Sequence, residues 1–264
     1  MSELIEPIGA VTFSEVPNEE FLALGMRNYW DGYFAGRAAP LGLAPAEVVH
    51  AVFYNFADGE VARHIPWVWG KITPEEAIAV RERGSAAALR QRIGVLADSP
   101  DLGRIADLTT RAAISAPTEG RPLYAGLRAL DIPQEPVAKL WHAATLLREH
   151  RGDGHNAVLL AHGISGTEAH VLVALTLGMK PEEFGRIHHL PKAKLAAVIN
   201  GLRDRGLVNA AGQFTATGRA TRQRIEDLTD QQAAPAYNTL TPHELDALIT
   251  ALTPIATALQ TTDD

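Results

Sequence analysis

The chain contains no cysteine among its 264 residues. This absence excludes disulfide bonds, thiolate nucleophiles and cysteine-ligated zinc sites. The chain also lacks a charged-then-apolar leader, and no apolar run approaches the length that a membrane-spanning helix needs. We therefore expect a cytoplasmic protein with no membrane partner.

Positive charge is the second feature in short supply. Lys and Arg number 24 against 31 Asp and Glu, which gives a net charge of −7 at pH 7. Such a chain has no general attraction to the phosphate backbone of nucleic acids, although a local basic patch could still bind one. Its 46% hydrophobic and 21% charged content is typical of a globular protein, and its length suits one large domain or two smaller ones.

Helical periodicity and helix-start signals dominate the sequence, and they predict a mainly α fold. Thr73-Pro74 is a typical helix cap followed by proline in the first turn. Ser165 and Glu168 have the spacing of a capping box, and Gly206 is the expected end of a later helix. The segment 207–217 (LVNAAGQFTAT) predicts a small hairpin.

The chain matches itself when it is shifted by about 122 residues, which indicates an internal duplication. The matches, in chain order, are Asp31-Gly32 with Asp153-Gly154, Gly42 with Gly163, Glu47 with Glu168, Arg63 with Arg186, and Arg81–Gly84 with Arg203–Gly206. Each match is short, but their order and near-constant spacing favour a common origin. We therefore expect a first unit at residues 18–130 and a second at 131–264, after an extended N-terminal arm at 1–17.

From Thr167 to about Leu228, the second unit has the order helix, short helix, a helix that ends in LRDRGLV (202–208), a hairpin, and FTATGR (214–219). This order resembles the winged helix-turn-helix of MarR-type regulators. The final helix, which begins TPHELDALITAL, resembles the dimerisation helix of that family.

Two further segments are FAGRAAPLG (34–42) and LREHRGDGH (147–155). With them, the whole chain is similar to the actinobacterial SalK-like family of tandem winged-helix proteins, whose function is poorly assigned. The resemblance implies two tandem MarR-like winged-helix units that form an intramolecular pseudo-dimer, with the first unit degenerate.

The second unit offers basic residues for DNA binding. MarR-like proteins lay the second helix of the pair in the major groove. Lys192 and Lys194 begin that helix here, and Arg186, Arg203 and Arg205 are nearby in the sequence. These residues suit contact with phosphate, but a solvated charged face explains them equally well.

Other features of the two units count against DNA binding. The hairpin residues 209–213 include no Lys or Arg, whereas a MarR wing presents a basic residue to the minor groove. In the first unit, Glu75 and Glu76 occupy the start of the matching helix, and SAAALRQRIG (85–94) replaces the wing. DNA is therefore a possible but doubtful partner.

The two Asp-Gly segments predict a second kind of site. Each is expected to interrupt a helix, and a pseudo-two-fold axis would bring them to a shared pocket between the two halves. The catalytic candidates are Asp31, His150, Asp153 and His155, and the ligand-binding candidates are Arg27, Tyr29, Trp30, Tyr33, Arg37, Arg148 and Arg151. An Asp beside His can hold a proton acceptor, and arginines can clamp a carboxylate or phosphate. The alternative is that these residues form buried ion pairs that tie the two copies together.

No metal or cofactor motif accompanies these residues. The histidine spacings include no HExxH or His-x-His pattern, so we predict no metal site, and no cofactor is identified. The leading interpretation is a small-molecule-binding protein, with or without a catalytic activity. The alternative is a ligand-responsive MarR-type transcriptional regulator that binds DNA through Lys192, Lys194 and Arg203.

Overall fold

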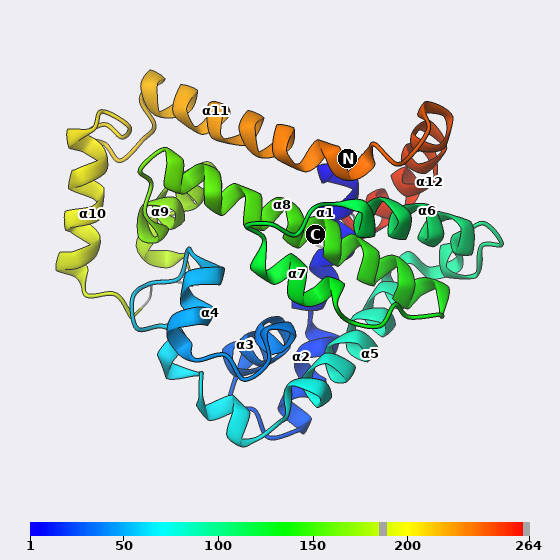
Figure 1. Ribbon diagram of the computed structural model, residues 1–264. Coiled ribbons are helices and arrows are strands. Elements are labelled where there is room, and N and C mark those ends of the chain that lie inside the picture. Colours follow the sequence, from blue (N-terminus) through cyan, green and yellow to red (C-terminus); the bar gives the residue numbers. More distant parts are fainter. Residues whose placement is uncertain (185–188, 261–264) are drawn as a thin grey trace. The chain divides into compact units, whose positions relative to one another are not determined.

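The computed structural model describes residues 1–184 and 189–260, so Arg186 and the last four residues lie outside the described part (Figure 1). The described residues form twelve α-helices joined by turns and short 3₁₀ segments, and they contain no β-strand. One antiparallel bridge joins Val208 to Phe214. The expectation of a mainly α fold is confirmed.

The described residues gather into two compact units made of interleaved segments. Unit 1 comprises residues 1–44, 67–153 and 233–264, and unit 2 comprises residues 45–66 and 154–232. These spatial units do not coincide with the ranges 18–130 and 131–264 of the sequence matches. The duplication itself stays a prediction, because it concerns the origin of the chain.

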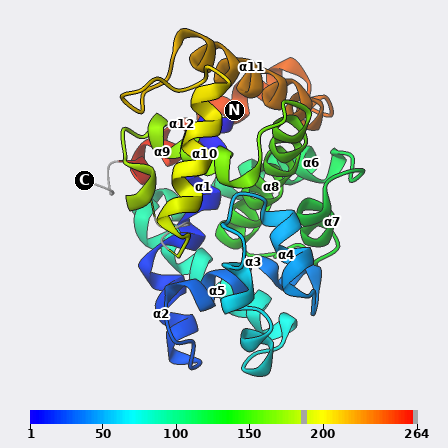
Figure 2. The same cartoon turned by 90° about the vertical axis from the view of Figure 1, so that its left-hand side faces the viewer.

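Unit 1 is built from helices that bury small and aliphatic side chains. Its complete helices are α1 (Ser2–Ala10), α2 (Glu15–Ala23), α3 (Tyr29–Ala38), α5 (Pro74–Ile93), α6 (Leu102–Ser115), α7 (Pro122–Arg128) and α12 (Pro242–Gln260), and α8 (Pro136–Ala161) begins in this unit. Helix α1 packs on α12, and both α2 and α3 pack on α5 (Figure 2). The predicted cap of α5 is confirmed, because Thr73 and Glu76 form a reciprocal capping box.

The expectation of an extended N-terminal arm is wrong. Residues Ser2–Ala10 form α1, with Pro7 inside the helix, and Val11 continues it as a 3₁₀ turn. Ile5, Ile8 and Val11 are all buried. Their spacing places them on one helical face, and the burial of that face outweighs the hydrogen bond that proline cannot donate.

The expected helix breaks at the two Asp-Gly segments are also wrong. Helix α8 runs without interruption through Asp153-Gly154, and Asp31-Gly32 lies inside α3, whose start is capped by Asn28. Gly32 serves packing, because a Cβ there would lie only 2.8 Å from the Cβ of Phe21. Glycine inside a helix costs about 1 kcal/mol relative to alanine, and tertiary contacts readily exceed this cost.

Unit 2 contains several of the helix starts and ends that the sequence predicts. Its helices are α4 (Ala46–Phe53), α9 (Gly166–Thr176), α10 (Lys192–Asp204) and α11 (Ala216–Ala233), which begins in this unit. The predicted capping box of Ser165 and Glu168 starts α9, and Gly206 follows α10 with a positive φ of 68°. The predicted hairpin, called the wing below, is confirmed. It is closed by the Val208–Phe214 bridge and by a hydrogen bond from Asn209 N to Gln213 O of 2.8 Å.

No single described helix has both the length and the apolar character to cross a membrane. One bent pair, Pro136–Ala161 with Gly166–Thr176, meets the length and composition criteria together.

Candidate functional site

Asp31 and Arg27, two of the candidate residues from the first Asp-Gly segment, form a closed ion pair in unit 1. The Asp31 carboxylate is fully buried and accepts from Arg27 Nε at 2.7 Å and from Nη2 at 2.8 Å. The Arg27 guanidinium also lies over the ring of Trp67, 3.9 Å from its centroid. Asp31 therefore orients an arginine and anchors the start of α3.

Arg37 and Arg148 share one buried carboxylate in unit 1. Glu149 Oε2 accepts from Arg37 Nη2 at 2.9 Å, and Glu149 Oε1 accepts from Arg148 Nη1 at 2.6 Å. Although burial opposes it, the two guanidinium groups lower the Glu149 pKa to about 2. Arg148 also pairs with Glu6 at 3.0 Å. Arg37 and Arg148 therefore take part in ion pairs with a buried carboxylate, as in the alternative interpretation of the Asp-Gly segments.

The aromatic candidates form a cluster in unit 1. Tyr33 stacks on Phe13 with ring centroids 5.4 Å apart, and Trp30 meets Tyr33 edge-on at 5.3 Å. Tyr29 contacts Trp30 at 5.2 Å, and Arg37 donates to the Tyr33 hydroxyl at 2.7 Å. These contacts set the orientation of the aromatic face of α3.

The candidates of α8 in unit 1 serve helix packing. Asp153 accepts from the backbone N–H of Tyr124 at 3.0 Å, so its carboxylate caps the start of α7. Burial raises the Asp153 pKa to about 6. His150 is buried edge-on against the Tyr124 ring, and burial lowers the His150 pKa to about 4. Arg151 is half-buried, and its charge opposes the rise in pKa that burial gives Tyr237.

His155, in unit 2, connects two helices. Its Nδ1 lies 3.0 Å from the buried hydroxyl of Thr229 on α11. It is separate from the capping arrangement of Asp153. Across residues 1–184 and 189–260, no three His, Asp or Glu side chains converge in a metal-binding arrangement.

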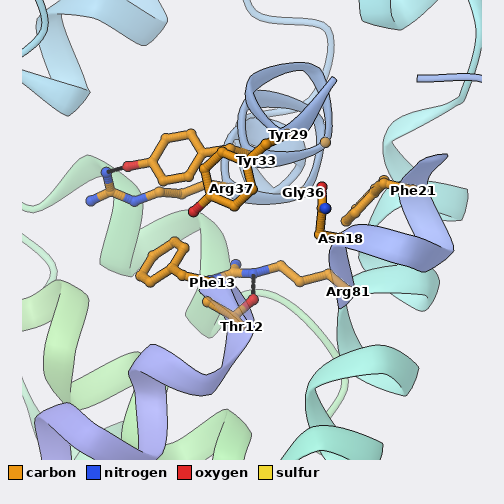
Figure 3. Close-up of a pocket in the computed structure, with 10 residues that line it drawn as sticks. Thr12, Phe13, Asn18, Phe21, Tyr29, Tyr33, Gly36, Arg37 and Arg81 are labelled. Atoms are coloured by element: carbon orange, nitrogen blue, oxygen red, sulfur yellow. Dashed lines mark hydrogen bonds between the residues drawn. The ribbon is translucent and has the colours of Figure 1, made fainter. Parts of the chain in front are cut away.

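The sequence-derived candidates Tyr29, Tyr33 and Arg37 line a small pocket in unit 1 (Figure 3). Thr12, Phe13, Asn18, Phe21, Gly32, Gly36 and Arg81 complete its walls. Its volume is about 20 Å³, and a single water needs about 10–15 Å³. The pocket can hold a water molecule and cannot hold an organic ligand.

Arg81, on α5, also lines this pocket and is not among the site residues that the sequence predicts. Its side chain is only 4% exposed, and Nε donates to Thr12 Oγ1 at 3.1 Å (Figure 3). In the part of the chain that the structure describes, it forms no ion pair at contact distance. Burial lowers the Arg81 pKa to about 10, although the charge of Glu149 opposes the change. Only tertiary structure distinguishes this arginine from the exposed Arg83 nearby.

Helix α10 of unit 2 presents its first turn to solvent. Lys192 and Lys194 are exposed, and neither forms an ion pair or a hydrogen bond with a described residue. Leu195 and Leu202 are buried and hold the opposite face of α10 in the core of unit 2. The first N–H groups of α10 lie at the same end of the helix as the two lysines. Pro191, the N-cap residue, provides no side-chain cap for them.

Arg203 and Arg205 have structural partners. Arg203 donates to the carbonyls of Asn209 and Ala210, each at 3.3 Å, and thereby fastens the wing to α10. Arg205 donates to Gly163 O at 2.9 Å and to Glu168 at 3.1 Å. The sequence pattern predicts Arg203 as a DNA contact, but its guanidinium is already used to brace the wing.

Positive charge is concentrated in the segment that runs from α9 into α11. Residues 165–224 contain nine Lys and Arg against four Asp and Glu, on a chain that is acidic as a whole. The exposed Arg222 and Arg224 of α11 contribute to this excess and were not among the predicted site residues. In unit 1, α5 has Glu75 and Glu76 in its first turn and continues through Ile93, with no wing.

In unit 2, α9 and α10 are consecutive α-helices, and a hairpin and α11 follow them. This order fits a helix-turn-helix. A model of a helix-turn-helix family matches residues 1–264, and the chain belongs to this family. No curated protein and no solved structure matches the chain.

Proposed function

We propose that this protein is a DNA-binding regulator of the MarR-like kind, with α10 as its recognition helix. Of the two functions that the sequence suggests, this is the one that the geometry and the family support better. The observation that carries it is the pair of exposed lysines, Lys192 and Lys194, at the uncapped start of α10. Helix N-termini and lysines both favour phosphate oxygens.

Phosphate contacts are expected to supply most of the binding energy. The exposed residues Ala193, Ala196 and Ala197 of α10 have no group that can hydrogen-bond to a base. The excess of positive charge in residues 165–224 acts on any DNA sequence. Binding should therefore weaken steeply with salt, because contact with phosphates releases counterions.

The test compares a double variant with a matched control. Lys192→Ala/Lys194→Ala removes two positive charges from α10, and Lys71→Ala/Lys139→Ala removes two from unit 1. Binding to a duplex from the upstream region of the protein's own gene is measured by fluorescence anisotropy between about 50 and 200 mM salt. The α10 variant should reduce the slope of log K against log salt by about 2, and the control should leave it unchanged.

Two outcomes would refute this function. One is that the wild-type chain leaves the anisotropy of the duplex unchanged at the lowest salt concentration. The other is an equal loss of affinity in the α10 variant and in the unit 1 control, because general charge rather than α10 would then explain binding.

A second candidate function is the binding of a small anionic molecule by unit 1. The observation in its favour is Arg81, a buried guanidinium to which the described residues offer no carboxylate at contact distance. Burying a charge without a partner is costly, and a bound anion would remove that cost. The ligand-binding candidates Arg27, Arg37 and Arg148 are engaged by Asp31 and Glu149.

A thermal-shift screen with small organic anions tests this second function. Binding should raise the melting temperature of the wild type, and Arg81→Met should abolish the shift. Arg83→Met, on the exposed side of α5, is the matched control and should preserve it. No shift with any anion, or equal shifts in both variants, would exclude it.

A further inference from the structure

Unit 1 contains a second pocket, which shares Gly36 and Arg81 with the small one. Its volume is about 250 Å³. It is lined by Gly36, Pro40, Glu75, Ile78, Arg81, Glu82, Leu127, Leu130, Asp131, Trp141 and His142. This volume is slightly below the usual range for ligand pockets, so it suits a small molecule.

The most buried part of this pocket is polar. Arg81, Trp141 and His142 are 4%, 3% and 4% exposed, and the Arg81 guanidinium lies 5.5 Å from the Trp141 ring centroid. Trp141 Nε1 and His142 Nε2 are buried and have no hydrogen-bond partner among the described residues. Buried polar groups are normally hydrogen-bonded, and these two nitrogens depart from that rule close to the Arg81 cation.

The outer part of the pocket has the opposite charge. Glu75 and Asp131 are exposed, and Glu82 is half-buried. Glu75, Ile78 and Glu82 are spaced three and four residues apart and therefore share one face of α5. Burial raises the Glu82 pKa.

Apolar side chains form the rest of the wall. Leu127 is buried, and Ile78, Leu130 and Pro40 are half-buried. A ligand in this pocket would therefore meet apolar surface between a buried cation and a group of outer carboxylates. These surroundings favour an apolar body between two charged groups.

Simple ions fit this arrangement poorly. An anion at Arg81 would be repelled by the outer carboxylates, and a cation at those carboxylates would leave Arg81 without a partner. Glu149 does not fill the role, because Arg37 and Arg148 already occupy its two oxygens. A molecule with both charges satisfies both ends of the pocket.

We propose that this pocket binds a small zwitterion, with its carboxylate on Arg81, its ammonium group on the outer carboxylates and an apolar body against Leu127 and Leu130. This inference rests on the second candidate function and specifies the class of its ligand. It differs from the sequence-based pocket, because none of the Asp-Gly residues lines it.

The experiment uses the full chain and isothermal titration calorimetry at pH 7. The probes are the twenty common amino acids and 4-aminobutanoate, with butanoate and butylamine as the singly charged controls. At least one zwitterion should bind about tenfold or more tightly than either singly charged control, because each lost charge-assisted bond costs about that factor.

Three variants locate the binding. Glu82→Gln removes one outer charge, and Leu130→Trp reduces the volume of the pocket. Glu119→Gln, at an exposed position of unit 1 outside the pocket, is the matched control. The first two should weaken zwitterion binding about tenfold or more, with unchanged circular dichroism, and the control should have no effect.

Each alternative result is informative. If butanoate binds as tightly as every zwitterion and still depends on Arg81, the second candidate function stands and the zwitterion proposal is overturned. If no probe binds and the anion screen is also negative, both are overturned. Binding that Glu82→Gln and Leu130→Trp leave unchanged would also overturn the assignment to this pocket.

Discussion

Replacing Glu149 with glutamine should destabilise unit 1 more than any other change to a single charge in this region. The carboxylate is 2% exposed and accepts hydrogen bonds from Arg37 and Arg148. In the variant, two guanidinium groups lose their shared counter-charge inside the protein. Breaking a buried ion pair by removing one partner costs about 3–5 kcal/mol.

The pKa of Glu149 gives an independent magnitude. Lowering it from 4.5 to about 2 corresponds to about 3 kcal/mol, at about 1.4 kcal/mol per pKa unit. Because the folded pKa is below the unfolded one, this stability is fully present above about pH 4.5. It is lost as the pH falls through about 2.

The assay is urea unfolding followed by circular dichroism at pH 7. Glu149→Gln should lower the free energy of unfolding by about 3 kcal/mol. Glu6→Gln is the matched control, since Glu6 pairs with the same Arg148 but its side chain is 53% exposed. Exposed ion pairs contribute at most about 1 kcal/mol, so the control should lose little.

The double variant Arg37→Gln/Glu149→Gln sharpens the test. It should lose less than the sum of the two single variants, because the uncompensated charge is removed together with its partner. If Glu149→Gln costs no more than Glu6→Gln, or if the two changes are simply additive, the account of a shared buried counter-charge is refuted.

Three further outcomes follow from contacts elsewhere. Gly166→Ala should destabilise unit 2 by about 1–3 kcal/mol in thermal unfolding, because the new Cβ would lie 2.0 Å from the backbone oxygen of Tyr54. Gly103→Ala, whose Cβ would meet no atom within 4 Å, should be neutral or stabilising. Similar melting temperatures for the two variants would contradict this. Burial lowers the pKa of both His142 and His150 to about 4, so stability should fall as the pH drops from 6.5 to 4. His142→Gln should make that fall less steep without removing it, and an unchanged profile would exclude His142 as a source. Arg203→Ala should speed amide hydrogen exchange in the wing around Asn209 without unfolding α10, and equal exchange rates in both proteins would argue against the brace.

Local chemistry explains which features could be predicted from the sequence. The capping boxes at Thr73 and Ser165 and the turn at Gly206 depend on residues only a few positions apart. Their predictions are confirmed because nearby side chains satisfy the helix-end groups whatever the rest of the chain does. The same reasoning holds for the short wing between α10 and α11.

The features that could not be predicted depend on partners far away in the sequence. Gly32 is small because Phe21 packs against it, and Asp153 caps α7, which precedes it by about thirty residues. An Asp-Gly pair therefore has the appearance of a turn without being one. Arg81 is buried and Arg83 is exposed, although both are arginines of α5 and lie only two positions apart. Only the packing of the helices separates them.

The brace between Arg203 and the wing has a consequence for the variability of this protein. The arginine binds carbonyl oxygens of the backbone, so the attachment does not depend on which side chains the wing carries. Ala210, Ala211 and Gln213 are all exposed and can change without loosening it. The wing is therefore a surface on which charge can be gained or exchanged at low cost to the fold.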